Sequence, residues 1–127
     1  MDSTRQTIMI VDDEEDILSI IQKALEKYGF KVLAFSDSTK ALDSFMFDPA
    51  PFVLVIGDIR MPGMNGLELS EKIWSIRPEM KVLFMTAYLV EEMNLQNGTL
   101  YKRDIIQKPF TIQKICDEVK LRLPATS

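Results

Sequence analysis

The sequence predicts a doubly wound α/β sandwich, in which helices cover both faces of a parallel sheet. Short apolar, β-branched runs recur along the chain, and such runs are typical of strands that a parallel sheet buries on both faces. Segments with apolar residues at helical spacing separate these runs. Repeated alternation of strand and helix favours right-handed crossovers within a single sheet.

The first half of the chain begins with an expected strand at residues 8–11. A helix follows it and ends at Gly29, because glycine commonly terminates helices. Its apolar stripe is expected at Ile17, Ile20, Ile21, Ala24, Leu25 and Tyr28. Residues 31–35 form the next strand, and Asp37 or Ser38 can cap the helix after it. The buried side of that helix is expected at Ala41, Leu42, Phe45 and, at its margin, Met46.

The second half continues the alternation, with one weak segment. Further strands are expected at residues 52–57, 81–85 and 104–107. The helix before Pro78 has its apolar face at Leu69, Ile73 and Ile76. Residues 89–103 lack a clean apolar period and contain Asn97-Gly98, so we expect a short or irregular helix there. Thr111 caps the last helix, whose inward residues are expected at Ile112, Ile115, Cys116, Val119 and Leu123.

Composition limits the function classes. The 127 residues suit one domain, with a core at about residues 7–122 and a tail or linker stump at 123–127. The net charge of −4 argues against non-specific contact with nucleic acid or an acidic membrane surface. No stretch is long and apolar enough to span a membrane, and the start is not a signal peptide. The single Cys116 fits a reducing setting, so we expect a cytoplasmic protein.

Acidic residues follow two of the expected strands. Asp12 and Asp13 come after residues 8–11, and Asp58 ends the apolar run that precedes it. Ligands of parallel sheets bind outside the carboxyl ends of the strands, so these carboxylates are expected at one edge. Crowded carboxylates repel one another unless a cation neutralises them, and hard divalent metals prefer oxygen ligands. Thr86 and Lys108 end two further strands, and the whole set predicts a site that handles phosphoryl groups.

Each of these residues has a plainer interpretation when taken singly. Asp12-Asp13 or Thr86 can cap a following helix, Asp58 can be a loop acid, and Lys108 can be a solvated charge. Their joint occurrence at four strand ends favours a site instead. Residues 14–16 are also acidic, and we expect them to provide a favourable negative first turn of a helix rather than further ligands.

These residues resemble the receiver domains of two-component response regulators, including the chemotaxis-regulator-like members. The resemblance covers about residues 7–122. It is carried by Asp12-Asp13, Asp58, Met61-Pro62 with Gly66, Thr86-Ala87 and Lys108-Pro109-Phe110. It implies a flavodoxin-like fold, with a five-stranded parallel sheet in the order 2-1-3-4-5 and five helices, the fourth of them short or irregular in this chain.

The resemblance also implies a function. A sensor histidine kinase or phosphotransfer protein would phosphorylate Asp58, and the domain would then switch conformation to control a partner or downstream domain. Such a domain assists its own phosphorylation and dephosphorylation but is not an enzyme in its own right. The implied cofactor is Mg²⁺, with Asp13, Asp58 and the backbone carbonyl of Arg60 as direct ligands and Asp12 acting through water. Thr86 and Lys108 would contact the phosphoryl group, and receivers usually have a cis bond between Lys108 and Pro109.

Other functions fit less well. Phosphatases of the haloacid dehalogenase type need a second acid two residues after the nucleophile, where this chain has Arg60. A flavodoxin-like electron carrier needs a phosphate-binding loop after the first strand, whereas residues 12–16 would repel phosphate. The glycine motifs of nucleotide-binding loops are absent.

A non-catalytic interaction module that keeps the fold without phosphorylation stays open as an alternative. Ile105 stands where receivers commonly have Tyr or Phe, which leaves the route of the switch open as well.

Overall fold

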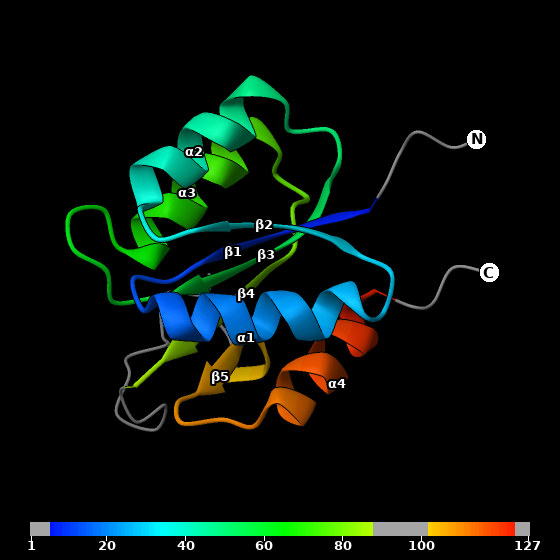
Figure 1. The fold of residues 1–127 in the computed structure, drawn as a ribbon. Coiled ribbons are helices and arrows are strands. Elements are labelled where there is room, and N and C mark those ends of the chain that lie inside the picture. The colour runs from blue at the N-terminus through cyan, green and yellow to red at the C-terminus, as the bar shows by residue number, and fades with distance from the viewer. Residues whose placement is uncertain (1–5, 88–101, 124–127) are drawn as a thin grey trace.

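The structure is a computed structural model that describes residues 6–87 and 102–123, and it contains a five-stranded sheet in the order β2-β1-β3-β4-β5 (Figure 1). The strands are β1 (Thr7–Val11), β2 (Lys31–Phe35), β3 (Phe52–Asp58), β4 (Val82–Thr86) and β5 (Ile105–Gln107). All neighbouring pairs are parallel. The predicted sheet and its order are confirmed, and each strand boundary lies within one residue of the expected position.

The helices are α1 (Glu15–Glu26), α2 (Ser38–Phe47), α3 (Gly66–Ile76) and α4 (Ile112–Arg122), with a short 3₁₀ turn, η2 (Lys102–Asp104), before β5. The short or irregular helix expected at residues 89–103 lies almost entirely outside the described residues. The described part of the chain therefore confirms four of the five expected helices.

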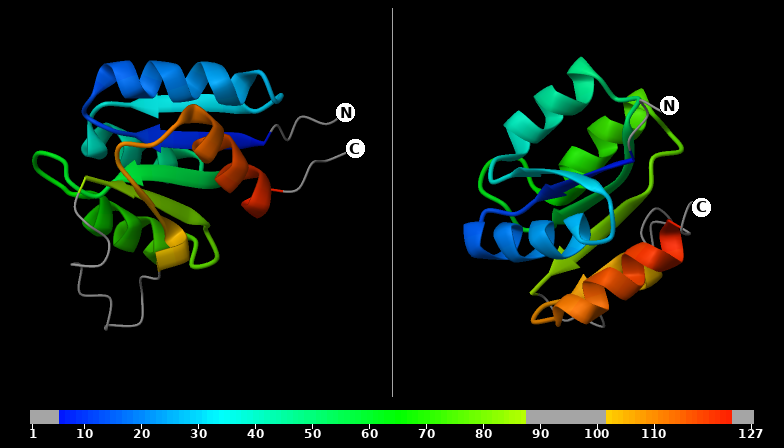
Figure 2. Two further views of the ribbon diagram at one scale, coloured as in Figure 1. Left: turned by 90° about the horizontal axis from the view of Figure 1, so that it is seen from below. Right: turned by 45° about the vertical axis from the view of Figure 1, so that its right-hand side comes forward.

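Helices cover both faces of the sheet, as the doubly wound prediction requires. In Figures 1 and 2, α2 and α3 lie on one face, and α1 and α4 lie on the other. Ile8 and Ile10 of β1 pack into the cluster under α1 and α4, whereas Met9 and Val11 pack into the cluster under α2 and α3. Successive strand residues point to opposite faces, so β1 is buried on both sides.

Polar side chains determine where most of the helices begin. The Asp37 carboxylate accepts hydrogen bonds from two backbone N–H groups of α2, and the Thr111 side chain accepts one from α4, as predicted. A capping box between Asn65 and Glu68 starts α3. By contrast, the side chain of Glu14, the N-cap residue of α1, makes no capping bond. That side chain is therefore available for other contacts.

The buried face of α1 agrees with the prediction at Ile17, Ile21, Ala24 and Leu25, which pack into the core, and differs from it at three other positions. Leu18, Ile21 and Leu25 face the sheet, while Ile20 and Tyr28 are each 50% exposed. The helix carries apolar residues on more than one side, so periodicity alone did not identify the side that meets the sheet.

Two residues of α2 and α3 also lie further out than expected. Met46 is exposed because it follows the buried Phe45, and consecutive helical residues point about 100° apart. Ile76 is the last residue of α3 and is exposed as well. Within residues 6–87 and 102–123, the structure contains no helix of the length and apolarity needed to cross a bilayer.

Candidate functional site

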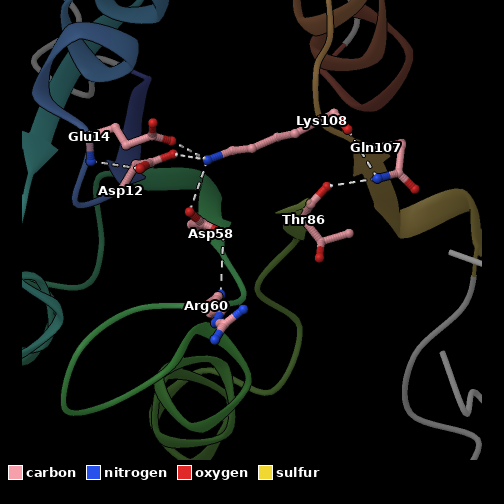
Figure 3. A network of polar contacts seen from close by, with 7 residues as sticks. All are labelled: Asp12, Glu14, Asp58, Arg60, Thr86, Gln107 and Lys108. Atoms are coloured by element: carbon pink, nitrogen blue, oxygen red, sulfur yellow. Dashed lines mark hydrogen bonds and ion pairs between the residues drawn. The ribbon is translucent and has the colours of Figure 1, made fainter. Parts of the chain in front are cut away.

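Side chains from separate strands meet at the carboxyl edge of the sheet (Figure 3). Asp12 follows β1, Asp58 ends β3, Thr86 ends β4 and Lys108 follows β5. The strands β1 and β3 are neighbours in parallel register, with Val11 opposite Gly57, and this pairing brings Asp12 and Asp58 to the same place. The predicted convergence is present for the side chains of Asp12, Asp58 and Lys108, whereas Thr86 contacts Lys108 through its backbone carbonyl oxygen.

The ammonium of Lys108 bridges three carboxylates. Its Nζ atom lies 2.9 Å from Asp12 Oδ2, 2.9 Å from Asp58 Oδ2 and 3.0 Å from Glu14 Oε1. A lysine ammonium has three N–H donors, so each carboxylate can accept one. The side chains of Asp12 and Asp58 are 0% and 8% exposed, whereas that of Glu14 is 59% exposed and forms the rim of the cluster.

Burial and hydrogen bonding act in opposite directions on the charges of this cluster. Burial raises the pKa of the Asp12 carboxyl, because it outweighs the hydrogen bonds from the Glu14 backbone and from Lys108 that favour the ionised form. Burial alone would lower the pKa of Lys108, but its hydrogen bonds to Asp12, Asp58 and Glu14 prevail and raise that pKa above its ordinary value. Lys108 therefore remains protonated at physiological pH.

The backbone around Lys108 is tied to β4. Its N–H donates to the Thr86 carbonyl oxygen at 2.6 Å. The side-chain amide of Gln107 donates to the same carbonyl at 3.2 Å and to the Lys108 carbonyl at 3.1 Å. The Lys108-Pro109 bond is cis, as predicted. Sequence reasoning did not identify Gln107, and its place directly before Lys108 was the only signal for it.

The loop after β3 folds back onto Asp58. The Arg60 N–H donates to Asp58 Oδ1 at 3.2 Å, and the Gly66 N–H donates to the Ile59 carbonyl at 2.8 Å. A Cβ atom on Gly66 would lie 2.2 Å from the Asp58 carbonyl oxygen, far inside van der Waals contact. Only glycine allows this approach of two backbone segments, which explains Gly66 in physical terms.

The carboxylates form a group that could hold a cation. One oxygen from each of Asp12, Glu14 and Asp58 lies within 4.8 Å of the others, and carboxylate oxygens suit Mg²⁺. This group includes Glu14, which was expected to serve only the first turn of a helix. It does not include Asp13, which is exposed, so a direct bond from Asp13 to the metal stays a prediction.

The structure explains why Glu14 joins Asp12, a relationship that the sequence did not reveal. Residues two apart in extended backbone share a face, and Glu14 is extended, with φ −91° and ψ 104°. The alternation Asp12, Asp13, Glu14 therefore favours Asp12 and Glu14 on the same side.

A groove opens beside Lys108. Its volume is about 590 Å³, and its lining includes Ile17 and Ile20 of α1, Ala87, Pro109 and Phe110. Thr86, next to Ala87 in the chain, is fully buried. Glu14 and Lys108 also line the groove, so the groove reaches the rim of the carboxylate cluster.

Comparisons with known proteins point to one family. The chain matches the response regulator receiver domain model over residues 8–120. The response regulator receiver protein CpdR of Brucella abortus is 30% identical, and the match covers 93% of this chain and 97% of that protein. The C4-dicarboxylate transport transcriptional regulatory protein DctD of Rhizobium meliloti is 33% identical, with 93% of this chain matching only 25% of that protein.

Solved structures agree with the sequence comparisons. The crystal structure of a response regulator receiver domain protein from Clostridium thermocellum matches with a TM-score of 0.77 and 30% sequence identity. The match covers 93% of this chain and 94% of that one.

Proposed function

The chain belongs to the response regulator receiver domain family of two-component signalling, and from this premise we propose that Asp58 is its phosphoacceptor. Lys108 and Thr86 contact the phosphoryl oxygens in this proposal. Asp13, Asp58 and the carbonyl of Arg60 bind Mg²⁺ directly, and Asp12 acts through water. The domain then switches conformation and controls a partner or a downstream domain.

The position of Lys108 carries this proposal. Its Nζ atom lies 2.9 Å from Asp58 Oδ2, so a positive charge already stands beside the carboxylate that would attack phosphorus. In the transfer, a carboxylate oxygen of Asp58 forms a bond to phosphorus while the bond from phosphorus to the donor breaks, giving an acyl phosphate. When bound, Mg²⁺ offsets negative charge on the transferring oxygens. Lys108 then exchanges the Asp58 carboxylate for a phosphoryl oxygen as its acceptor.

The phosphodonor must be another molecule when it carries phosphohistidine, because this chain has no histidine. The proposed donor is a sensor histidine kinase or a phosphotransfer protein. The groove beside Lys108 supports this choice, since its apolar lining includes Ile20, which is half exposed on α1. A protein surface packed there would bring its histidine to the edge where Asp58 lies.

The output is also a proposal. DctD, a transcriptional regulatory protein, is about four times as long as the segment that matches this chain, so receiver segments occur joined to other domains. We expect this domain to act on a partner or attached domain in the cytoplasm, without contacting nucleic acid or membrane itself, consistent with its net charge of −4. Its catalytic contribution is limited to assisting its own phosphorylation and dephosphorylation.

Intact-mass spectrometry tests the assignment of Asp58. Incubation with acetyl phosphate and Mg²⁺ should add one phosphoryl group, which hydroxylamine should remove as it does from an acyl phosphate. Asp58→Asn should remain folded and unmodified, while the matched variant Asp43→Asn, an exposed position in α2, should be modified like the wild type. Labelling of Asp58→Asn would refute the assignment. A wild-type protein that never takes up a phosphoryl group would support the non-catalytic interaction module instead.

A further inference from the structure

Glu14 contacts the site twice, although the proposed function gives it no role. Its backbone N–H donates to Asp12 Oδ1 at 2.8 Å, and its Oε1 atom accepts a hydrogen bond from Lys108 Nζ at 3.0 Å. It is the N-cap residue of α1, but its side chain makes no capping bond to the helix. The side chain of Glu14 therefore points to Lys108 and not to the helix end that it precedes (Figure 3).

A metal ion and the Lys108 ammonium compete for the same acceptors. In the metal-loaded state that the proposed function requires, Asp12 and Asp58 would share their negative charge between the cation and Lys108. Two of the three hydrogen bonds that hold the Lys108 ammonium would therefore weaken. Its side chain is only 11% exposed, so water can replace those acceptors only in part, and a buried ammonium without partners is costly. Glu14 is the remaining carboxylate, and it stands at the rim of the cluster.

We propose that Glu14 is a positioning residue that holds the Lys108 ammonium beside Asp58 in the metal-loaded protein until a phosphoryl oxygen takes over. This inference rests on the proposed function, because it assumes that a cation occupies the site. The hydrogen bond already present between Glu14 and Lys108 requires no rearrangement in that state. The rival role for Glu14 is that of a third metal ligand, since its carboxylate belongs to the group that could hold a cation.

Two variants separate these roles. Glu14→Gln removes the negative charge that binds Lys108. Glu15→Gln makes the same change of net charge one residue later, at an exposed position in the first turn of α1. Glu15 is not among the three carboxylates that contact the Lys108 ammonium. Any general effect of lost negative charge on Mg²⁺ binding should therefore appear in both variants.

Proton exchange of the Lys108 ammonium, followed by ¹⁵N NMR at saturating Mg²⁺, reports directly on the hydrogen bond between Lys108 and Glu14. Exchange should be about two- to fivefold faster in Glu14→Gln, as expected for a hydrogen-bonded ion pair with one exposed partner, and unchanged in Glu15→Gln. Titration should give the two variants the same dissociation constant for Mg²⁺. Unchanged exchange in Glu14→Gln would overturn the proposal. The proposal would also be overturned if Glu14→Gln bound Mg²⁺ about tenfold more weakly than Glu15→Gln, because Glu14 would then be a metal ligand.

The rate of phosphorylation by acetyl phosphate provides the second measurement. At saturating Mg²⁺, Glu14→Gln should be about two- to fivefold slower than Glu15→Gln. In a Lys108→Met background the two glutamine variants should be equal, because Glu14 acts through Lys108. A difference that persists without Lys108 would refute this route. If the wild type takes up no phosphoryl group, the proposed function fails; if it does and Glu14→Gln behaves like Glu15→Gln, only the role of Glu14 fails.

Discussion

Gly66 lies directly against the backbone of Asp58, so that a Cβ atom at position 66 would stand 2.2 Å from the Asp58 carbonyl oxygen and 2.9 Å from its carbonyl carbon. The same residue begins α3 and donates its N–H to the Ile59 carbonyl. The loop between β3 and α3 is thus closed by a contact between backbones, with no side chain between them. The position of Asp58 depends on this closure.

Gly66→Ala should therefore destabilise the fold by about 1–3 kcal/mol, the usual cost of overpacking, because the atoms that it meets are backbone and cannot rotate away. Urea denaturation measures this loss. Gly57→Ala is the matched control, since a Cβ atom at this neighbouring buried glycine of β3 meets nothing within 4 Å. Wild-type stability of Gly66→Ala would show that the loop moves without cost.

Mg²⁺ should raise the melting temperature of the wild type, because a cation relieves repulsion between the carboxylates at the sheet edge. A ligand that binds only the folded state at about 100 times its dissociation constant stabilises it by about 2.7 kcal/mol. Asp13→Asn should lose most of this increase if Asp13 is a direct ligand. Asp16→Asn, which removes an exposed charge from the first turn of α1, should keep it. Thermal denaturation with and without Mg²⁺ decides, and an equal increase in both variants would exclude Asp13 as a ligand.

Lys108→Met should destabilise the metal-free protein by about 3 kcal/mol, because it removes one partner of a buried ion pair and leaves the carboxylates uncompensated. Mg²⁺ should then stabilise this variant more than it stabilises the wild type, since the cation no longer competes with an ammonium. Lys108→Arg keeps the positive charge and should respond to Mg²⁺ nearly as the wild type does. Chemical denaturation in Mg²⁺ and in EDTA provides the comparison, and equal responses of Lys108→Met and wild type would contradict competition.

The environment of Glu118, which lies in α4, predicts that the stability of the fold depends on pH. Burial alone would raise the pKa of this carboxyl, but hydrogen bonds from Arg122 and Lys114 outweigh it and lower the pKa below its ordinary value of 4.5. A lowered pKa in the folded state means that the ionised side chain stabilises the fold above pH 4.5 and that this contribution is lost as the pH falls through the folded-state value.

Glu118→Gln should therefore cost about 0.5–1 kcal/mol at neutral pH, from two ion pairs at helical spacing. The difference from the wild type should shrink as the pH falls below 4.5 and through the lowered folded-state pKa of Glu118. Urea denaturation across this range measures it. Glu71→Gln, at an exposed position in α3, should show no such trend. A difference that stays constant with pH would exclude the charge of Glu118 as its cause.

The sequence predicted the sheet and most of the site because both follow from local patterns. Apolar runs mark each strand, and the polar residue after a run must lie at the carboxyl edge, so Asp12, Asp58, Thr86 and Lys108 were placed correctly. The face of α1 was not predictable in the same way. Ile20 is as apolar as Ile21, and only packing against the sheet distinguishes the exposed side chain from the buried one.

The features that the sequence did not predict are contacts between residues far apart in the chain. Glu14 lies 94 residues before Lys108, and in the sequence it is one acid among several at the start of α1. Arg77 donates to the carbonyl oxygens of Pro49 and Phe52, which are 28 and 25 residues away, and thereby ties the end of α3 to the start of β3. Backbone carbonyls leave no trace in a sequence, so such a contact requires coordinates.

The hydrogen bond between Lys108 and Asp12 joins residues that are 96 positions apart in the chain. This separation has a consequence for the order in which the site forms during translation. Asp12 and Asp58 are translated well before Lys108. They can pair with the Lys108 ammonium only after β5, a three-residue edge strand, adds to β4. A nascent chain that lacks β5 therefore lacks the ammonium that pairs with these two carboxylates in the structure. Asp12 and Asp58 gain their lysine partner only when the sheet is complete.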